Sequence, residues 1–168
     1  IKMPKRKLGM DVLTAAKQRI EYVFDNFDRI YISFSAGKDS AVMLHLVMAE
    51  AIKRNKVIGC LFIDWECQIS LTIEFAKQMF EFYADNIEPY WVALPMKTWN
   101  ATSQFEPEWT AWDENKKDLW VRQPEKISII DKSFFPFYHD EMSFEEFVPM
   151  FGEWYANGDS CAAFVGIR

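Results

Sequence analysis

Residues 57–63, VIGCLFI, form an almost continuous apolar run between two segments with helical patterns. Such a run is typical of a strand that is buried on both faces, and strands of this kind occur in parallel sheets that helices cover on both sides. The run therefore predicts a buried strand in the parallel sheet of an α/β fold.

Helix-like and strand-like segments alternate around this run. Apolar residues recur at helical spacing in segments 11–27, 41–54 and 69–85, and strand-like runs occupy 29–34 and 89–94. Asp11 is placed to cap the first helix. The order predicts parallel strands joined by right-handed crossovers. The predicted fold class is α/β: a doubly wound, mainly parallel, Rossmann-like sheet with flanking helices.

The second half of the chain is less regular. Residues 96–140, here called the insertion, are rich in aromatic and turn residues and contain Trp99, Trp109, Trp112 and Trp120. A loop of this length is unusual inside a compact domain, so a functional lid or binding element and a packed excursion are both open. Residues 143–156 predict a helix, with Ser143 and Glu146 at capping-box spacing and Pro149 expected to kink or divide it. Residues 161–167, CAAFVGI, predict a fourth buried strand.

The chain of 168 residues is expected to form one domain, 1–168. Ligands of open α/β sheets bind at the carboxyl ends of the strands. The chain stops directly after a predicted strand, so we expect it to be the N-terminal part of a longer protein.

Composition excludes several functional classes. A formal net charge of −6 argues against a general nucleic-acid binder. Two interpretations are open for the basic run at Lys2, Lys5, Arg6 and Lys7: a solvated N-terminal arm and a local contact with nucleic acid. No apolar segment is long enough for a membrane span or a signal peptide, which predicts a cytoplasmic protein. The spacing of Cys60, Cys67 and Cys161, with only two histidines, predicts neither a disulfide framework nor a metal site.

The stretch SFSAGKDS, residues 33–40, lies where a predicted strand turns into a helix. Backbone N–H groups and the positive end of the helix dipole bind phosphate at such a turn. Ala36 and Gly37 are small enough for close approach, Ser35 and Ser40 carry hydroxyl donors, and Lys38 can neutralise an oxyanion. Asp39 can cap the helix or hold a metal ion through water. The stretch matches neither the Walker A pattern nor GxGxxG.

The residues SAGKDS resemble the PP-loop, usually SGGxDS, of the adenine nucleotide alpha-hydrolase superfamily, which includes ATP pyrophosphatases, phosphoadenylyl-sulfate (PAPS) reductases and sulfurylases. Ala36 stands where these proteins usually have glycine. FIDWE, residues 62–66, is similar to the family segment whose backbone recognises adenine. GIR, residues 166–168, resembles the start of the reductases' GxRxxxS segment, with Arg168 placed to meet phosphate or sulfate.

The stretches WVALP, FEPEWTAW and WVRQP further resemble a bacterial PAPS-reductase-like branch. That branch includes the immunoglobulin-binding regulator A proteins, which are often encoded beside a ParB-like nuclease protein.

The resemblance implies a set of site residues. Those expected to bind the nucleotide are Phe34, Ser35, Ala36, Gly37, Lys38, Asp39, Ser40, Ile63, Asp64, Trp65, Gly166 and Arg168. Lys38, Asp39 and Ser40 are expected to act in catalysis. The implied ligand is ATP or a PAPS-type nucleotide with Mg²⁺, and the implied reaction is attack at the alpha-phosphate with release of pyrophosphate.

Two alternatives stay open. One is a PAPS or adenylyl-sulfate reductase whose nucleophilic cysteine lies outside this chain, because the chain has no ECGxH-like motif. The other is a non-catalytic, nucleotide-sensing partner of a ParB-like protein. For Asp64 and Glu66, ligand binding and capping of the next helix are equally open. For Arg122, contact with a substrate anion and a structural ion pair are both open.

Overall fold

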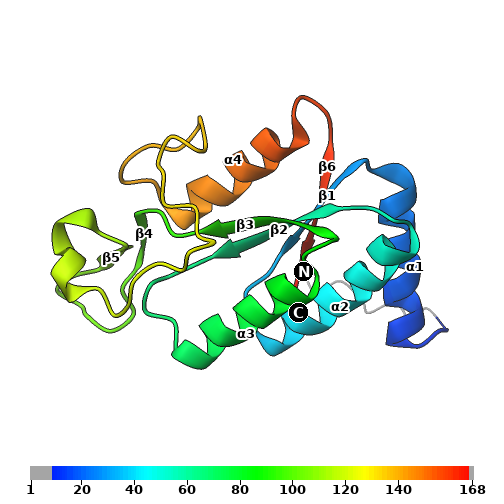
Figure 1. Cartoon of the computed structure of the whole chain (residues 1–168), viewed down its shortest axis with the longest axis horizontal. Coiled ribbons are helices and arrows are strands. Elements are labelled where there is room, and N and C mark those ends of the chain that lie inside the picture. The colour runs from blue at the N-terminus through cyan, green and yellow to red at the C-terminus, as the bar shows by residue number, and fades with distance from the viewer. Residues whose placement is uncertain (1–8, 167–168) are drawn as a thin grey trace, which may run out of the picture.

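The computed structural model describes residues 9–166, and a parallel sheet of four strands forms its centre (Figure 1). The strands are β1 Arg29–Ser33, β2 Ile58–Ile63, β3 Ile87–Val92 and β6 Cys161–Val165, in the order β3-β2-β1-β6. The predicted parallel α/β sheet is confirmed. The predictions for the basic run near the N-terminus and for Arg168 concern positions outside the described residues.

Helices cover both faces of this sheet (Figure 1). They are α1 Val12–Asn26, α2 Lys38–Lys53 and α3 Ser70–Phe82 on one face, and α4 Phe144–Ala156 on the other. Neighbouring residues of a strand point to opposite faces. Thus Ile32 packs in the core under α2 and α3, whereas Tyr31 packs under α4. Two apolar layers explain why every residue of β2 is buried.

The predicted caps are confirmed. Asp11 accepts a hydrogen bond of 2.9 Å from the N–H of Thr14 at the start of α1, and Ser143 forms a complete capping box with Glu146 at the start of α4. Division of α4 at Pro149 is wrong, because the helix runs unbroken across this proline. Burial of Phe147, Phe151 and Tyr155 against the sheet offsets the missing hydrogen bond.

The prediction of a buried fourth strand is also wrong. In the described part of the chain β6 pairs with β1 alone, so it is an edge strand, and Val165 is 50% exposed. An edge strand can carry a short apolar sequence because its two faces still contact helices; here β6 contacts α4 on one face and α2 on the other.

The insertion has regular structure, contrary to the expectation of a long irregular loop. β4 Met96–Trp99 and β5 Glu108–Ala111 form an antiparallel hairpin, and a 3₁₀ helix, η1 Glu114–Leu119, follows. Figure 1 shows this group at the end of the molecule toward which β2 and β3 point. Trp112 is 1% exposed, whereas Trp99 is 73% exposed. The base of the insertion is therefore a packed structure, and its tip is open to solvent.

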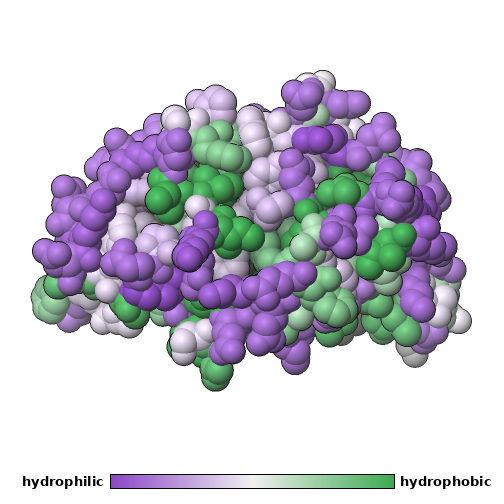
Figure 2. All heavy atoms as spheres, viewed as in Figure 1, coloured by the Kyte–Doolittle hydropathy of each residue, from purple (hydrophilic) through white to green (hydrophobic). Residues whose placement is uncertain are grey.

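The surface is mixed. Figure 2 shows hydrophobic side chains in separate patches between hydrophilic ones, an ordinary pattern for a globular domain. Within residues 9–166, no helix has the length and apolarity that a bilayer crossing requires.

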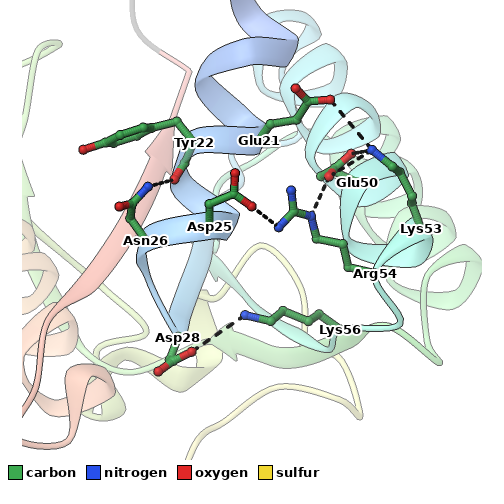
Figure 3. A network of polar contacts seen from close by, with 9 residues as sticks. All are labelled: Glu21, Tyr22, Asp25, Asn26, Asp28, Glu50, Lys53, Arg54 and Lys56. Carbon is green, nitrogen blue, oxygen red and sulfur yellow. Dashed lines mark hydrogen bonds and ion pairs between the residues drawn. The ribbon is translucent and has the colours of Figure 1, made fainter.

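A polar network joins α1 to the end of α2 (Figure 3). Glu50 is 8% exposed and accepts hydrogen bonds from Arg54 Nε at 2.5 Å and Lys53 Nζ at 3.1 Å. Arg54 Nη1 also donates to Asp25 of α1 at 2.6 Å. Burial raises the pKa of Glu50, but the hydrogen bonds from Arg54 and Lys53 outweigh it and the net pKa is lowered. Glu50 therefore stabilises the fold in its ionised form.

Replacing Glu50 by glutamine is expected to lower the free energy of unfolding at pH 7 by about 1–2 kcal/mol, since charge-assisted hydrogen bonds are lost. A lowered folded-state pKa means that this stabilisation is present above the ordinary value of 4.5 and is lost as pH falls through the folded-state pKa. Urea unfolding at pH 7, 5 and 4 should show the gap closing on acidification. The exposed Glu153→Gln variant serves as control, and a gap that widens in acid contradicts the assignment.

Candidate functional site

The loop from β1 to α2 is closed by its own serines. Ser40 Oγ donates to the carbonyl of Gly37 at 3.0 Å, accepts from the N–H of Ser35 at 3.3 Å, and lies 3.0 Å from Ser35 Oγ. Phe34 extends the strand ladder by one residue, because its N–H donates to the carbonyl of Leu61 at 2.8 Å. The loop is thus fixed on both sides before any ligand arrives.

The N-terminus of α2 faces outward from this loop. Gly37 is the N-cap and supplies no side-chain hydrogen bond to the first turn. Helix N-termini present N–H groups and a partial positive charge. The side chain of Lys38 is 79% exposed and its Nζ lies 3.7 Å from Asp39 Oδ1. The arrangement can receive an anionic group from the solvent side.

Ala36 adopts the left-handed conformation, with φ of 56°. This region favours glycine, and an L-residue there costs roughly 1–2 kcal/mol. The resemblance to the SGGxDS pattern places a glycine at this position. The alanine therefore keeps the loop geometry at a cost in backbone energy.

An Ala36→Gly variant is expected to unfold with a free energy higher by about 0.5–1 kcal/mol, because relief of the left-handed strain exceeds the entropy that glycine adds to the unfolded chain. Chemical denaturation checks it. The matched control is Ala49→Gly on the exposed face of α2, which should lose about 1 kcal/mol since glycine is a poor helix former. Equal losses at both positions would refute the strain argument.

The loop lies at a topological switch point. From β1 the chain continues to β2 and β3 on one side, and β6 lies on the other side of β1. Ligands of open α/β sheets bind at such points. Gly166, directly after β6, packs on the loop: a Cβ there would lie 3.2 Å from Ser40 Cα. Of the predicted site residues, the structure brings Ser35, Gly37, Ser40 and Gly166 together.

The end of β2 carries a buried polar network. Asp64 is 1% exposed, and its carboxylate accepts hydrogen bonds from Trp91 Nε1 at 2.8 Å and from the N–H of Glu66 at 3.0 Å. The same carboxylate pairs with Arg122 of the insertion. The Asp64 carboxylate thus makes its hydrogen bonds and its ion pair with protein groups.

Glu66 and Trp112 complete this network. The Glu66 carboxylate accepts from the N–H groups of Trp112 at 2.8 Å and Val121 at 3.3 Å, and Trp112 Nε1 donates to the carbonyl of Asp64 at 2.6 Å. The guanidinium of Arg122 lies over the Trp112 ring at 5.1 Å. Neither Asp64 nor Glu66 caps α3, whose N-cap is Ile69 without a side-chain hydrogen bond. Both carboxylates instead anchor the insertion.

Sequence reasoning missed this anchoring role. The sequence predicted ligand binding or helix capping for Asp64 and Glu66. For Arg122 it allowed an ion pair but did not identify the partner. Trp65, another predicted site residue, is half-buried, and its ring lies 5.5 Å from that of Phe144 in α4. The one available signal was the concentration of tryptophan around Arg122 in the insertion.

No described cysteine lies in an activating environment. Burial raises the pKa of Cys67, and the neighbouring Glu66 carboxylate raises it further, although the residue reaches the surface. Burial also raises the pKa of Cys60 and of Cys161. A thiol with a raised pKa is a poor nucleophile at neutral pH. Catalysis by one of these three thiols is therefore disfavoured.

No group of three metal-binding side chains occurs between residues 9 and 166. Mg²⁺ in nucleotide enzymes commonly uses one or two carboxylates together with the phosphates. Asp39 in the first turn of α2 fits that arrangement. Asp64 does not, because its carboxylate is enclosed by Trp91, Arg122 and the backbone of Glu66.

Comparison with known proteins identifies the family of this chain. Residues 29–168 match the family model of the phosphoadenosine phosphosulfate reductase domain. The chain is 45% identical over 165 residues to the uncharacterized protein YbdN of Escherichia coli strain K12, a match that covers 98% of this chain and 40% of that protein. The chain thus spans less than half of the relative's length. It belongs to the phosphoadenosine phosphosulfate reductase domain family.

Proposed function

We propose that this domain binds ATP or another adenylyl nucleotide at the PP-loop, residues 35–40, and acts at the alpha-phosphate with release of pyrophosphate. The observation that carries the proposal is the serine-closed loop at the N-terminus of α2, located at the switch point of the sheet. Membership of the reductase domain family supports an adenylyl ligand.

The chain's own groups suit this reaction. The N–H groups of the first turn of α2 and the ammonium of Lys38 would bind the phosphates, and the hydroxyls of Ser35 and Ser40 would orient them. An acceptor oxygen or nitrogen bonds to the α-phosphorus, and the bond to the bridging oxygen breaks with its electron pair leaving on pyrophosphate. The acceptor's proton passes to solvent. Charge growing on the leaving group is stabilised where the helix dipole and Lys38 already lie.

The other predicted nucleotide-binding residues follow the parallel strands in the sequence, and each would have its own part in holding the ligand. Phe34, Ala36 and Gly37 would face the phosphates through the backbone, whereas Ile63 and Trp65 at the end of β2 would contact the nucleoside. Asp64, which protein groups enclose, would support this segment from below the nucleotide. Gly166 and Arg168, which follow β6 in the sequence, would border the nucleotide on the side opposite β2. Asp39 would hold Mg²⁺, which would neutralise phosphate charge when bound.

A second function is favoured by the family description: a PAPS or adenylyl-sulfate reductase. Reduction requires a nucleophilic thiol, and the three cysteines Cys60, Cys67 and Cys161 have pKa values raised by burial. The thiol would therefore come from outside these residues. Partnership with a ParB-like protein stays a prediction from the resemblance alone.

Calorimetric titration of the full protein with ATP and with PAPS, each with Mg²⁺, separates these functions. A Lys38→Ala variant is expected to bind ATP at least about tenfold more weakly, because a charge-assisted phosphate contact is lost. Lys17→Ala, an exposed position on α1, should bind as the wild type does. Pyrophosphate release from ATP would support the leading function.

Binding of PAPS alone would transfer support to the reductase. ATP binding without turnover would support a sensing role. Absence of binding by both nucleotides would refute the proposal.

A further inference from the structure

We infer that Arg122 and Trp112 of the insertion are positioning residues that hold the end of β2 in place for the nucleoside half of the ligand. This inference rests on the proposed function, since it concerns the same site. It assigns to the insertion a task in ligand recognition that the PP-loop residues do not perform.

The sheet places the end of β2 beside the PP-loop. Ser33 of β1 pairs with Leu61 of β2, and neighbouring strands lie about 4.8 Å apart. A ligand whose phosphates lie on the loop after β1 must extend its other half over an adjacent strand end. Residues 64–66 continue β2 at that edge. Asp64 and Glu66 are buried, whereas Trp65 between them is half-buried and is in reach of the nucleoside.

The backbone of residues 64–66 owes its shape to the insertion. Trp112 Nε1 donates to the carbonyl of Asp64, and the N–H groups of Trp112 and Val121 donate to the Glu66 carboxylate. Arg122 pairs with the carboxylate of Asp64, which also accepts the N–H of Glu66. Four contacts from the insertion thus converge on a segment of three residues.

Both sides of this junction are strained. Glu66 has φ of 59° and Trp112 has φ of 55°, in the left-handed region that large side chains avoid. Such conformations persist only where the surrounding contacts over-determine them, and they concentrate at ligand-binding and catalytic sites. The contacts from the insertion therefore stabilise a backbone conformation at the end of β2 that a residue such as Glu66 rarely adopts.

The buried ion pair between Arg122 and Asp64 attaches the insertion at a high cost in desolvation free energy. Arg122 Nε and Nη1 are buried, and neither has a hydrogen-bond partner among the described residues; the Trp112 ring faces the guanidinium instead. Apolar side chains of similar volume often hold a junction at lower cost than a buried pair. A precise geometry at Asp64 is what the arginine supplies and an apolar residue would not.

The experiment compares two ligands in calorimetry with Mg²⁺: ATP, which has a nucleoside, and inorganic tripolyphosphate, which has none. Arg122→Lys and Trp112→Phe are expected to weaken ATP binding about three- to tenfold and to leave tripolyphosphate within about twofold. Lys38→Ala should weaken both ligands. Trp99→Phe, at an exposed tryptophan outside the network, should change neither.

Each outcome bears on the inference. Circular dichroism first confirms that the variants are folded at the assay temperature, and tripolyphosphate binding reports an intact PP-loop in each. ATP binding equal to that of the wild type, or equal weakening of both ligands, would overturn the positioning role while the proposed function stands. If the wild-type protein bound neither ligand, the proposed function and the inference would both fail.

Discussion

An Arg122→Met variant is expected to unfold with a free energy about 3–5 kcal/mol lower than that of the wild-type protein, because removal of one partner leaves a buried charge without its counterion. The charge is that of Asp64, whose side chain is fully buried, whereas that of Arg122 is 18% exposed. The hydrogen bonds from Trp91 Nε1 and from the N–H of Glu66 would remain. Guanidinium chloride unfolding measures the loss.

A surface ion pair provides the control for the Arg122→Met variant. Lys97 of β4 and Glu141 approach to 3.5 Å with side chains 32% and 78% exposed. Water screens such a pair, so Lys97→Met should cost no more than about 1 kcal/mol. If Arg122→Met cost as little as this control, the network at the end of β2 would not hold the insertion.

A Gly59→Ala variant is expected to lose about 3 kcal/mol of unfolding free energy, because the added methyl overfills the space between β2 and α4. A Cβ at this position would lie 2.9 Å from Tyr31 Cβ and 3.0 Å from the hydroxyl of Tyr155. That hydroxyl accepts the N–H of Gly59 at 2.9 Å and donates to the carbonyl of Ile30 at 3.0 Å. It therefore bridges two strands, and its displacement would leave both backbone groups unpaired.

Gly152 of α4 is the control, since it faces Tyr31 from the helix. A Cβ there would meet Tyr31 Oη at 3.4 Å, an ordinary contact. Gly152→Ala should thus be neutral or stabilising by up to about 1 kcal/mol, because alanine favours helices. Thermal and urea unfolding of both variants test the contrast, and a stable Gly59→Ala protein would show that Tyr155 yields without cost.

Much of the fold was predictable because its signals are local. The apolar run at 57–63 indicated a strand covered on both faces, and β2 is buried throughout. Asp11 and the pair Ser143 and Glu146 lie within one helical turn of the groups that they cap, so spacing alone identified them. The strand-to-helix turn at SAGKDS was visible for the same reason, although the left-handed conformation of Ala36 was not.

Other features depend on contacts that no local pattern encodes. Asp64 is 58 residues from Arg122 and 27 from Trp91, and only the packed structure identifies these partners. The exposure of β6 follows from its place at the sheet edge, which its apolar sequence does not specify. Pro149 remains inside α4 because the energy of burying an aromatic face exceeds that of one missing hydrogen bond.

The amino-acid sequence alone predicts that this chain alternates helices with parallel strands and that its first strand ends in a turn of the kind that can receive an anion. Both features arise from residues within a few positions of one another, where backbone sterics and hydrophobic periodicity act directly. The tertiary structure decides what surrounds that turn: Gly166 packs against Ser40, and the insertion holds the end of β2 through Asp64 and Glu66. These contacts form only when distant segments pack together, since a buried carboxylate takes whichever donors the fold brings to it.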